Sequence, residues 1–315
     1  MTHSRPLLAL ATALLLGAPA CAATPAATAP ATTAPPAAAA PGPIPVYTLD
    51  GPGGLKPTDV EWHAESRTFF VSTFNQGALF QGRLDDPRTP AFLQAQPGQT
   101  ADSMRVAGGR IYVCAGIEAQ IRVYDIATRQ RTGTFEVGSG GHVIDAEVTG
   151  TGDVYVTDAI LPMLWHLTPD QVAAGSGTAQ GIPVTPEIPI HGDTNLFGIV
   201  ALNDHRLVVG HRADGQLYRI DLDDSGGRTI VPITGAKVPL NGGMALDGDR
   251  LVVADQKGVA VLALGDDAGT ATLVQQIDDP SIREPASVTV ADGRYLVVGF
   301  AKQAPDTVTS LPAKR

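Results

Sequence analysis

The sequence is poor in cysteine and in positive charge, and both shortages exclude classes of protein. Two of the 315 residues are cysteine, Cys21 and Cys114, so neither a disulfide framework nor a metal site built on cysteine is expected. The chain has 22 Lys and Arg residues against 32 Asp and Glu, which gives a net charge of −10. A general nucleic-acid binder needs a basic face to neutralise phosphates, and this composition excludes one.

Several catalytic and cofactor motifs are missing as well. No Gly-x-Ser-x-Gly occurs, which excludes the nucleophile elbow of the α/β-hydrolases. No Gly-x-Gly-x-x-Gly or phosphate loop occurs, so nothing indicates a dinucleotide or nucleoside triphosphate site. Cys114 lies inside an apolar run, RIYVCAG, and is expected to be a small buried core residue.

The N-terminal region has the features of a bacterial export signal over residues 1–22. Arg5 supplies a positive charge, and Leu7 to Leu16 supply an apolar segment too short to cross a bilayer. Ala20-Cys21-Ala22 fits ordinary cleavage, whereas Ala18-Pro19-Ala20-Cys21 resembles a lipoprotein box in which Cys21 would carry the lipid; the two alternatives stay open. Residues 23–43 are almost wholly Ala, Pro and Thr and predict a disordered linker. We therefore expect an exported protein that is secreted, periplasmic or lipid-anchored at the envelope.

Residues 44–315 are built from repeated units of four short strands. The unit is clearest at 196–233, where LFGIVAL, RLVVGHR, QLYRIDL and RTIVPI are separated by turn residues. The first strands of successive units start near residues 59, 101, 142, 196, 243 and 285. A period in the forties with four strands per unit predicts an all-β fold, a six-bladed β-propeller, because sheets stacked around an axis cover both faces of each sheet.

The last unit has no fourth strand of its own at the C-terminus. Residues 307–311 are left for its third strand, and the unused strand-like segment is 45–49 at the start of the domain. We expect this segment to complete the last blade and close the ring, which removes a free sheet edge, and an open or seven-bladed ring is the alternative.

These units resemble the propellers of the SMP-30/gluconolactonase family, within the strictosidine-synthase-like and paraoxonase-like superfamily. The resemblance rests on segments such as FGIVA at 197–201, QLYRID at 216–221 and DVYVTD at 153–158. It implies a divalent cation, usually calcium, at the end of the central channel, and an activity that opens lactones or other esters. The family ligands are a Glu, Asn residues and an Asp, and these positions correspond here to Thr58, Ile144, Phe197 and Gly242. The metal site implied by the resemblance is therefore expected to be degenerate.

Other polar residues fall where the loops of a propeller converge on the channel mouth. We predict a ligand-binding set at or near the starts of the first strands, and a set of candidate catalytic residues at the ends of the second strands. The ligand-binding set is Asp59, Asp102, His142, Asp145, Asn195 and Asn241, and the catalytic candidates are His211, Asp255 and Asp158. A histidine paired with either Asp fits general acid/base chemistry near neutral pH. Structural roles at strand ends are the alternative for each residue.

Two functions stay open from the sequence. The first is binding of a small molecule or a partner at the channel mouth by a monomer, with no nucleic acid involved and no membrane contact except a lipid on Cys21. The second is a calcium-dependent lactonase or esterase, with a shifted cation site for which Asp59, Asp145, Asn195 and Asn241 are the candidate ligands. Oxygen ligands that converge on one point would favour the enzyme, and an apolar floor made by Ile144 and Phe197 would argue against it.

Overall fold

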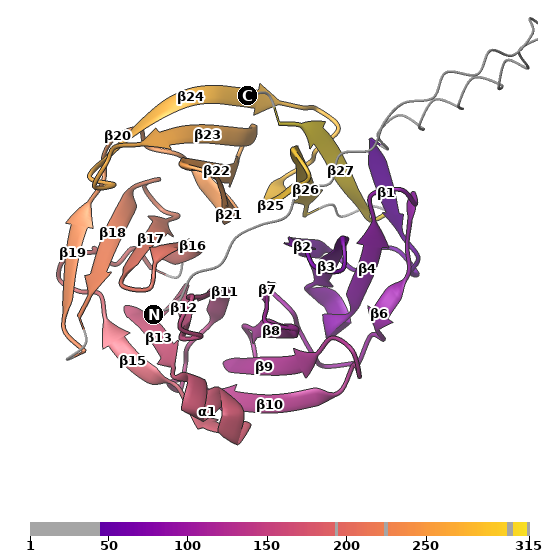
Figure 1. Cartoon of the computed structure of the whole chain (residues 1–315), viewed down its shortest axis with the longest axis horizontal. Coiled ribbons are helices and arrows are strands. Elements are labelled where there is room, and N and C mark those ends of the chain that lie inside the picture. The colour runs from indigo at the N-terminus through magenta and orange to yellow at the C-terminus, as the bar shows by residue number, and fades with distance from the viewer. Residues whose placement is uncertain (1–44, 193–194, 224–225, 301–304, 314–315) are drawn as a thin grey trace, which may run out of the picture. The chain divides into compact units, whose positions relative to one another are not determined.

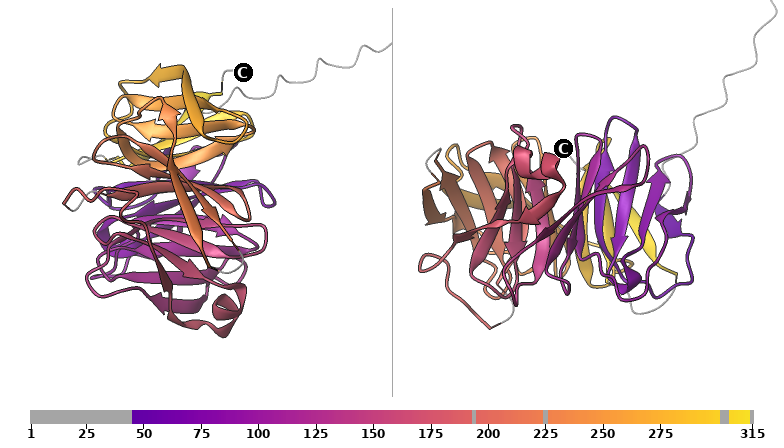
Figure 2. Two further views of the ribbon diagram at one scale, coloured as in Figure 1. Left: turned by 90° about the vertical axis from the view of Figure 1, so that its left-hand side faces the viewer. Right: turned by 90° about the horizontal axis from the view of Figure 1, so that it is seen from below.

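The fold is a ring of six small β-sheets around a central channel. A computed structural model describes residues 45–192, 195–223, 226–300 and 305–313, apart from the side chains of Leu240 and Asn241. Each sheet contains a four-stranded antiparallel meander, and the six sheets are arranged as blades around one axis (Figure 1). Seen from the side, the strands run between the two faces of the ring (Figure 2). The predicted six-bladed β-propeller is confirmed.

The first three blades follow one another in chain order. Their strands are β2 (Pro57–His63), β3 (Thr68–Thr73), β4 (Leu79–Arg83) and β6 (Ala91–Leu93) in blade 1; β7 (Ser103–Ala107), β8 (Arg110–Ala115), β9 (Gln120–Asp125) and β10 (Arg131–Glu136) in blade 2; and β11 (Val143–Val148), β12 (Val154–Asp158), β13 (Met163–Leu167) and β15 (Gln180–Pro183) in blade 3.

The other three blades repeat the arrangement. Their strands are β16 (Leu196–Asn203), β17 (Arg206–His211), β18 (Leu217–Leu222) and β19 (Arg228–Pro232) in blade 4; β21 (Leu240–Asp247), β22 (Arg250–Asp255), β23 (Gly258–Leu264) and β24 (Thr270–Asp278) in blade 5; and β25 (Pro285–Ala291), β26 (Arg294–Gly299), β27 (Thr307–Pro312) and β1 (Val46–Leu49) in blade 6.

The core lies between neighbouring blades. Every residue of β3 and of β12 is buried, because the second strand of a blade is covered on both faces. Between blades 4 and 5, for example, Val200 and Val208 share a cluster with Met244 and Leu251. Such runs of Val, Ile, Leu and Phe pack well on a pleated surface covered on both sides, which is why they form the strands. Cys114 is buried in β8, as expected.

The ring is closed by the N-terminal strand. β1 pairs antiparallel with β27, with Tyr47 opposite Val308, and so becomes the fourth strand of blade 6. A short strand from blade 1, β5 (Arg88–Thr89), adds to its outer edge in parallel. The predicted closure by residues 45–49 is confirmed, and the two ends of the domain are held in one sheet.

Several outer elements were not predicted. A short helix, α1 (Pro169–Ala174), begins after a capping box made by Thr168 and Gln171, and β14 (Ser176–Thr178) then pairs in parallel with β10 of blade 2. As a result the fourth strand of blade 3 comes after this insertion, at 180–183, where it pairs with β13. A further edge strand, β20 (Thr234–Gly235), joins blade 5, and a 3-10 turn, η1, spans Asn75–Gly77.

The predicted leader and linker, residues 1–43 with Cys21, lie outside the described residues. Among the helices that are described, none has the length and apolar character needed to span a membrane.

Candidate functional site

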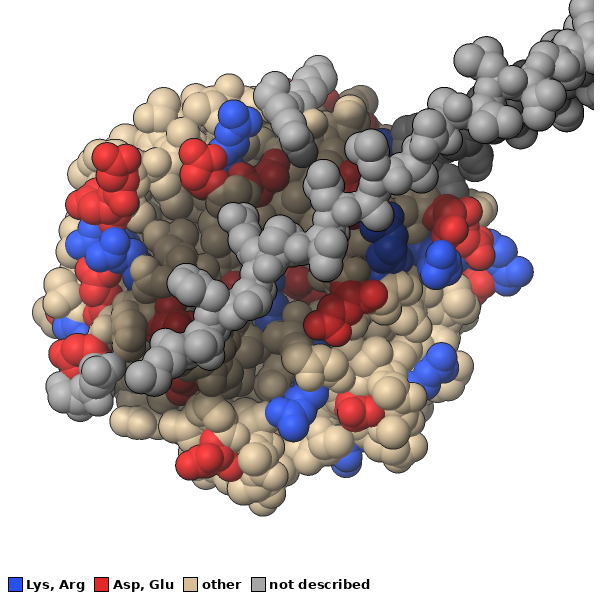
Figure 3. Space-filling view, in the orientation of Figure 1, with Lys and Arg blue, Asp and Glu red and all other residues tan. Residues whose placement is uncertain are grey.

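A pocket with a volume of about 490 Å³ lies at the mouth of the channel, a size typical of small-molecule sites. Inner strands and the turns after the second strands of several blades form its wall. The lining residues are Thr58, Phe74, Asp102, His142, Ile144, Ala159, Ile160, Phe197, Arg212, Glu284, Pro285, Ala286 and Phe300. One face of the ring is hollowed at its centre, with acidic and basic side chains on the wall of the hollow (Figure 3). The pocket thus combines an apolar lining with a few polar groups.

The pocket wall contains a histidine–carboxylate pair, His142 and Asp102. His142 Nε2 lies 3.0 Å from Asp102 Oδ1, and the other oxygen of Asp102 accepts a hydrogen bond from the Gly116 backbone N–H at 3.0 Å. The hydrogen bond to Asp102 and the negative charges of Asp102 and Asp158 raise the pKa of His142 above its usual range, although partial burial opposes them. With Nε2–H donated to Asp102, Nδ1 is the nitrogen that gains or loses the titrating proton. Both residues belong to the predicted ligand-binding set.

Cationic groups stand over the aromatic rings of the pocket. The Arg212 guanidinium lies 4.5 Å from the centre of the Phe197 ring. Lys56 Nζ lies 5.7 Å from the centre of the Phe74 ring and 5.3 Å from that of Phe300. These distances are within the range of cation–π contacts, which hold a positive charge beside an apolar surface.

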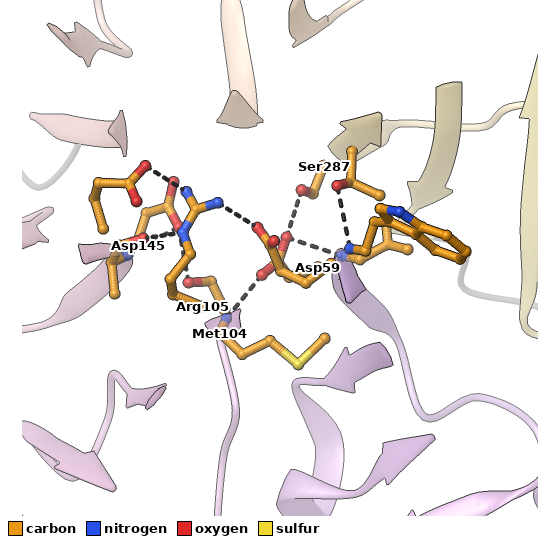
Figure 4. Close-up of polar contacts among 12 residues, drawn as sticks. Asp59, Met104, Arg105, Asp145 and Ser287 are labelled. Carbon is orange, nitrogen blue, oxygen red and sulfur yellow. Dashed lines mark hydrogen bonds and ion pairs between the residues drawn. The ribbon is translucent and has the colours of Figure 1, made fainter. Parts of the chain in front are cut away.

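Next to the pocket lies a cluster of buried ionic groups around Arg105 (Figure 4). One residue further along β2 and β11 than Thr58 and Ile144 come Asp59 and Asp145, which are 3% and 5% exposed. Arg105 reaches Glu61 at 2.9 Å and Glu147 at 3.1 Å. The cluster therefore links the inner strands of blades 1, 2 and 3.

The two buried Asp residues hold neighbouring blades together. Asp59 accepts hydrogen bonds from the Met104 backbone N–H at 2.8 Å and from the Ser287 hydroxyl at 2.5 Å, and so joins blade 1 to blades 2 and 6. Asp145 accepts from the Ser103 hydroxyl at 3.0 Å and from the Ile199 N–H at 3.1 Å, and so joins blade 3 to blades 2 and 4.

Burial controls the protonation of this cluster. Loss of solvent, together with the charge of Asp59, raises the pKa of Asp145 to about 7, and Arg105 and the hydrogen bonds offset only part of the effect. Burial also raises the pKa of Asp59 and, further, that of Glu61. Burial lowers the pKa of Arg105, but the charges of Glu147 and Glu61 outweigh this and raise it. The guanidinium is therefore the fixed positive charge of the channel.

The positions that the family resemblance matches to metal ligands do not fit a calcium ion. Ile144 and Phe197 line the pocket with side chains that have no donor atoms, and the Thr58 hydroxyl donates to the Ala101 carbonyl at 2.9 Å. A Cβ at Gly242 would lie 1.6 Å from the Ala286 carbonyl oxygen, so no carboxylate can be accommodated there. Calcium requires six to eight oxygen ligands, and this set does not supply them.

Asn195, another residue of the predicted ligand-binding set, is bound to local backbone groups. The side-chain oxygen of Asn195 accepts a hydrogen bond from the His191 backbone N–H at 2.7 Å, and its amide nitrogen donates to the Ala159 carbonyl at 3.0 Å. Neither bond involves Asp59 or Asp145. The side chain of Asn241 lies outside the described residues.

The catalytic candidates do not pair as expected. Asp158 accepts from the Trp165 indole N–H at 2.9 Å, and Asp255 accepts from the Gly258 N–H at 2.8 Å. His211 contacts neither of them and instead lies 2.7 Å from Asp214. The three residues therefore do not form the expected acid/base pair, because each is taken up by groups of its own blade.

Sequence reasoning did not include several pocket residues in the site. Phe74 and Phe300 follow the second strands of blades 1 and 6, at the strand ends where blades 3, 4 and 5 carry Asp158, His211 and Asp255. Had apolar residues at these ends been considered, both would have been found. Arg212 follows His211 directly, and a basic residue at a strand end was an available signal.

Comparison with known proteins identifies the fold of the chain but does not show a family to which it belongs. No family model matches the chain, and no curated protein matches it. Solved structures with a similar fold include a streptogramin B lyase, with 13% identity, a TM-score of 0.61 and coverage of 86% of this chain and 87% of that one. A luciferin-regenerating enzyme has 15% identity, a TM-score of 0.61 and coverage of 86% and 95%.

A catalytically inactive virginiamycin B lyase from Staphylococcus aureus, solved with quinupristin, has 10% identity, a TM-score of 0.56 and coverage of 85% and 98%. Likenesses at this level of identity show a common architecture only. The comparisons and the sheet topology together identify the chain as a six-bladed β-propeller.

Proposed function

We propose that the chain binds a small organic anion at the channel mouth, with an apolar part of the ligand against the aromatic rings. The observation that carries this proposal is the composition of the pocket wall. Phe74, Phe197 and Phe300 supply apolar surface, while Arg212 and His142 supply positive charge or hydrogen-bond donors. A mainly apolar pocket with a few convergent polar groups is the usual form of a small-molecule site.

The charged side chains in and beside the pocket indicate the class of ligand that we expect it to bind. Arg212 lines the pocket, Lys56 lies beside two of its rings, and the carboxylate of Asp102 raises the pKa of His142 and so favours its cationic form. Glu284 also lines the pocket and would disfavour a ligand with several negative charges. A single carboxylate on an aromatic or alicyclic body meets both conditions, because one guanidinium can hold it through paired hydrogen bonds.

The test is a binding screen of matched pairs, each a carboxylic acid and its primary amide, followed by thermal unfolding and calorimetry. The proposal predicts that acids raise the unfolding midpoint and that their amides bind at least about tenfold more weakly, since a charge-assisted contact is lost. Arg212→Gln should remove the preference for the acid. The control Arg110→Gln, at an exposed position on blade 2, should retain it. Equal binding of acids and amides by the wild type would contradict the proposal.

A second candidate, hydrolysis of a lactone or ester without a metal ligand set, is favoured by the His142–Asp102 pair. In this reaction His142 takes a proton from water as the water oxygen attacks the carbonyl carbon, and the proton then passes to the departing alkoxide. A screen of lactones and esters with the wild type and His142→Gln separates the two functions. Turnover that is lost in the variant supports hydrolysis, and binding without turnover supports the first proposal alone.

Export and anchoring of the chain stay predictions from the N-terminal sequence. We propose that the binding domain acts outside the cytoplasm, because the predicted signal and linker would place it there. Labelling of Cys21 with a radioactive fatty acid in cells, compared with Cys21→Ser, distinguishes the lipid-anchored form from the ordinary secreted one.

A further inference from the structure

Two histidines and an aspartate meet on blade 4, outside the set of residues that line the pocket. His191, His211 and Asp214 each offer one ligand atom, and these atoms lie within 4.8 Å of one another. His211 is the last residue of β17, and Asp214 lies in the turn that follows. His191 comes from the connection between blades 3 and 4. The cluster therefore joins two segments twenty residues apart in sequence.

The Nε2 atom of His211 offers a lone pair in a buried position. Its side chain is 0% exposed, and its Nδ1 lies 2.7 Å from Asp214 Oδ1. Because an ionised carboxylate can only accept a hydrogen bond, Nδ1 carries the hydrogen and donates it to Asp214, and Nε2 is left as an acceptor. Nε2 is buried and has no hydrogen-bond partner among the described residues. A buried acceptor without a donor costs free energy, and a bound cation would satisfy it.

The groups around His211 have the arrangement that is usual around a histidine that binds a metal ion. A carboxylate that holds one ring nitrogen fixes the tautomer and turns the other nitrogen toward the metal. The His191 ring lies beside that of His211, with 5.2 Å between the ring centres. The Gln216 N–H donates to Asp214 at 3.0 Å through Oδ1, so Oδ2 takes part in neither of these two bonds and remains as a ligand oxygen.

Asn195 holds the two segments in this arrangement. Its side-chain oxygen accepts from the His191 N–H at 2.7 Å, and its backbone carbonyl accepts from the Arg212 N–H at 2.9 Å. Asn195 is 1% exposed, so neither bond competes with bulk water. The relative position of His191 and His211 is thereby set by a buried residue and not by the two side chains alone.

From this geometry we propose that His191, His211 and Asp214 form a site for a zinc-class divalent cation. Two imidazole nitrogens with one carboxylate oxygen suit zinc or a neighbouring transition metal, whereas calcium prefers oxygen ligands. Three protein ligands leave a fourth position for water or another small ligand. The site is next to the pocket, because Arg212 follows His211 and lines the pocket wall. The inference is independent of the proposed function.

The test measures zinc itself on the full-length chain without a histidine tag. The protein is stripped with chelator, dialysed and titrated with zinc chloride against a chromophoric zinc indicator, and bound zinc per chain is counted by mass spectrometry of the metal. We expect one zinc per chain and a raised unfolding midpoint, because an ion that binds only the folded state stabilises it. Excess calcium should not displace the zinc.

Three variants locate the ion. His191→Ala, at an exposed position, and Asp214→Asn should each weaken zinc binding by about 10–100-fold or more while the circular dichroism spectrum is unchanged. His205→Ala, an exposed histidine in a turn of the same blade, should bind zinc as the wild type does. The proposal would be overturned if the wild type held no stoichiometric zinc, or if His191→Ala and Asp214→Asn bound zinc as tightly as His205→Ala. His211→Ala is not needed for this decision, since loss of a fully buried side chain alters folding.

Discussion

Arg105 is the residue on which the inner part of the channel depends. Its guanidinium contacts Glu61 and Glu147, and the carboxyl groups of Asp59 and Asp145 act on it as well. Isolated carboxylates at this depth would be strongly destabilising, because the loss of solvent costs far more than a hydrogen bond returns. The guanidinium therefore supplies the positive charge beside the buried carboxyl groups of Glu61 and Glu147.

We expect Arg105→Met to destabilise the fold by about 3–5 kcal/mol at pH 7, because it leaves Glu61 and Glu147 buried without a positive partner. Urea unfolding measures the change. Arg110→Met, an exposed position in the same blade, is the control and should change the free energy of unfolding by no more than about 0.5 kcal/mol. Equal effects of the two substitutions would show that the cluster does not depend on Arg105.

The His142–Asp102 pair predicts a change that is visible in a titration. Asp102→Asn removes the charge and the carboxylate acceptor that raise the pKa of His142, so this pKa should fall. The histidine ring resonances, followed by NMR against pH, give the value. Asp153→Asn, which alters the similar contact of His166 with Asp153 at 2.7 Å, should leave the His142 pKa unchanged. An unaltered His142 titration in Asp102→Asn would contradict the assigned role of the pair.

The spacing of polar and charged residues on the inner strands was a signal in the sequence from which the channel cluster could have been predicted. Asp59 and Glu61 in blade 1, and Asp145 and Glu147 in blade 3, are two residues apart on inner strands, and so face the same side. Ser103 and Arg105 have the same spacing in blade 2. Only Asp59 and Asp145 were predicted as site residues. Glu61, Glu147 and Arg105 meet them only because the closed ring brings the inner strands of three blades together.

The strand β1 is only four residues long, but it completes the last blade and closes the ring. Four residues, Val46 to Leu49, complete blade 6, and they pack on blade 1 through Tyr47. The Tyr47 ring meets Phe69 edge to face with 4.9 Å between centres, and its hydroxyl donates to the Leu84 carbonyl at 3.2 Å. The strand thus joins the first and last blades of the ring.

Tyr47→Ala should lower the free energy of unfolding by about 3–5 kcal/mol, the range for loss of a large buried ring. Val46→Ala in the same strand is the matched control, and its effect should be small because Val46 is 40% exposed. Chemical unfolding of the two variants and the wild type makes the comparison. If Tyr47→Ala were no more damaging than Val46→Ala, ring closure through β1 would not stabilise the domain.

The second strands of the blades could be predicted from the sequence because they are compact, mainly apolar runs between turns, as at 206–211 and 250–255. The closing strand could be inferred because one strand was missing and one segment was unused. The edge strands β14 and β20 could not, because strands this short carry little pattern and owe their order to the neighbouring blade. The helix α1 was available in principle from the capping box of Thr168 and Gln171.

For the molecule as a whole, the buried carboxyl groups make stability depend on pH. The pKa of Asp145 is raised to about 7 in the folded chain, and those of Asp59 and Glu61 are raised too. In the folded state these carboxyl groups therefore hold protons that the unfolded chain has released above about pH 4. The stability that this difference contributes is lost as the pH rises through about 7.

Between pH 5 and pH 7.5 the free energy of unfolding should fall by at least about 1 kcal/mol, and Asp145→Asn, which does not titrate, should show a smaller fall. Denaturant unfolding at several pH values gives both slopes. A free energy of unfolding that rises across this window would mean that the buried acids are ionised and fully compensated in the native ring.

The proposed ligand of the channel mouth is an organic anion, whereas the family that the sequence resembles holds calcium there. Thermal unfolding of the whole chain, freed of transition metals beforehand, distinguishes the two ligands when it is measured with excess calcium, with a calcium chelator, and with the strongest-binding acid of the screen. We expect the same unfolding midpoint with calcium and with chelator, and a higher midpoint with the acid. A midpoint raised by calcium and unaffected by the acid would overturn the proposal and favour the cation site.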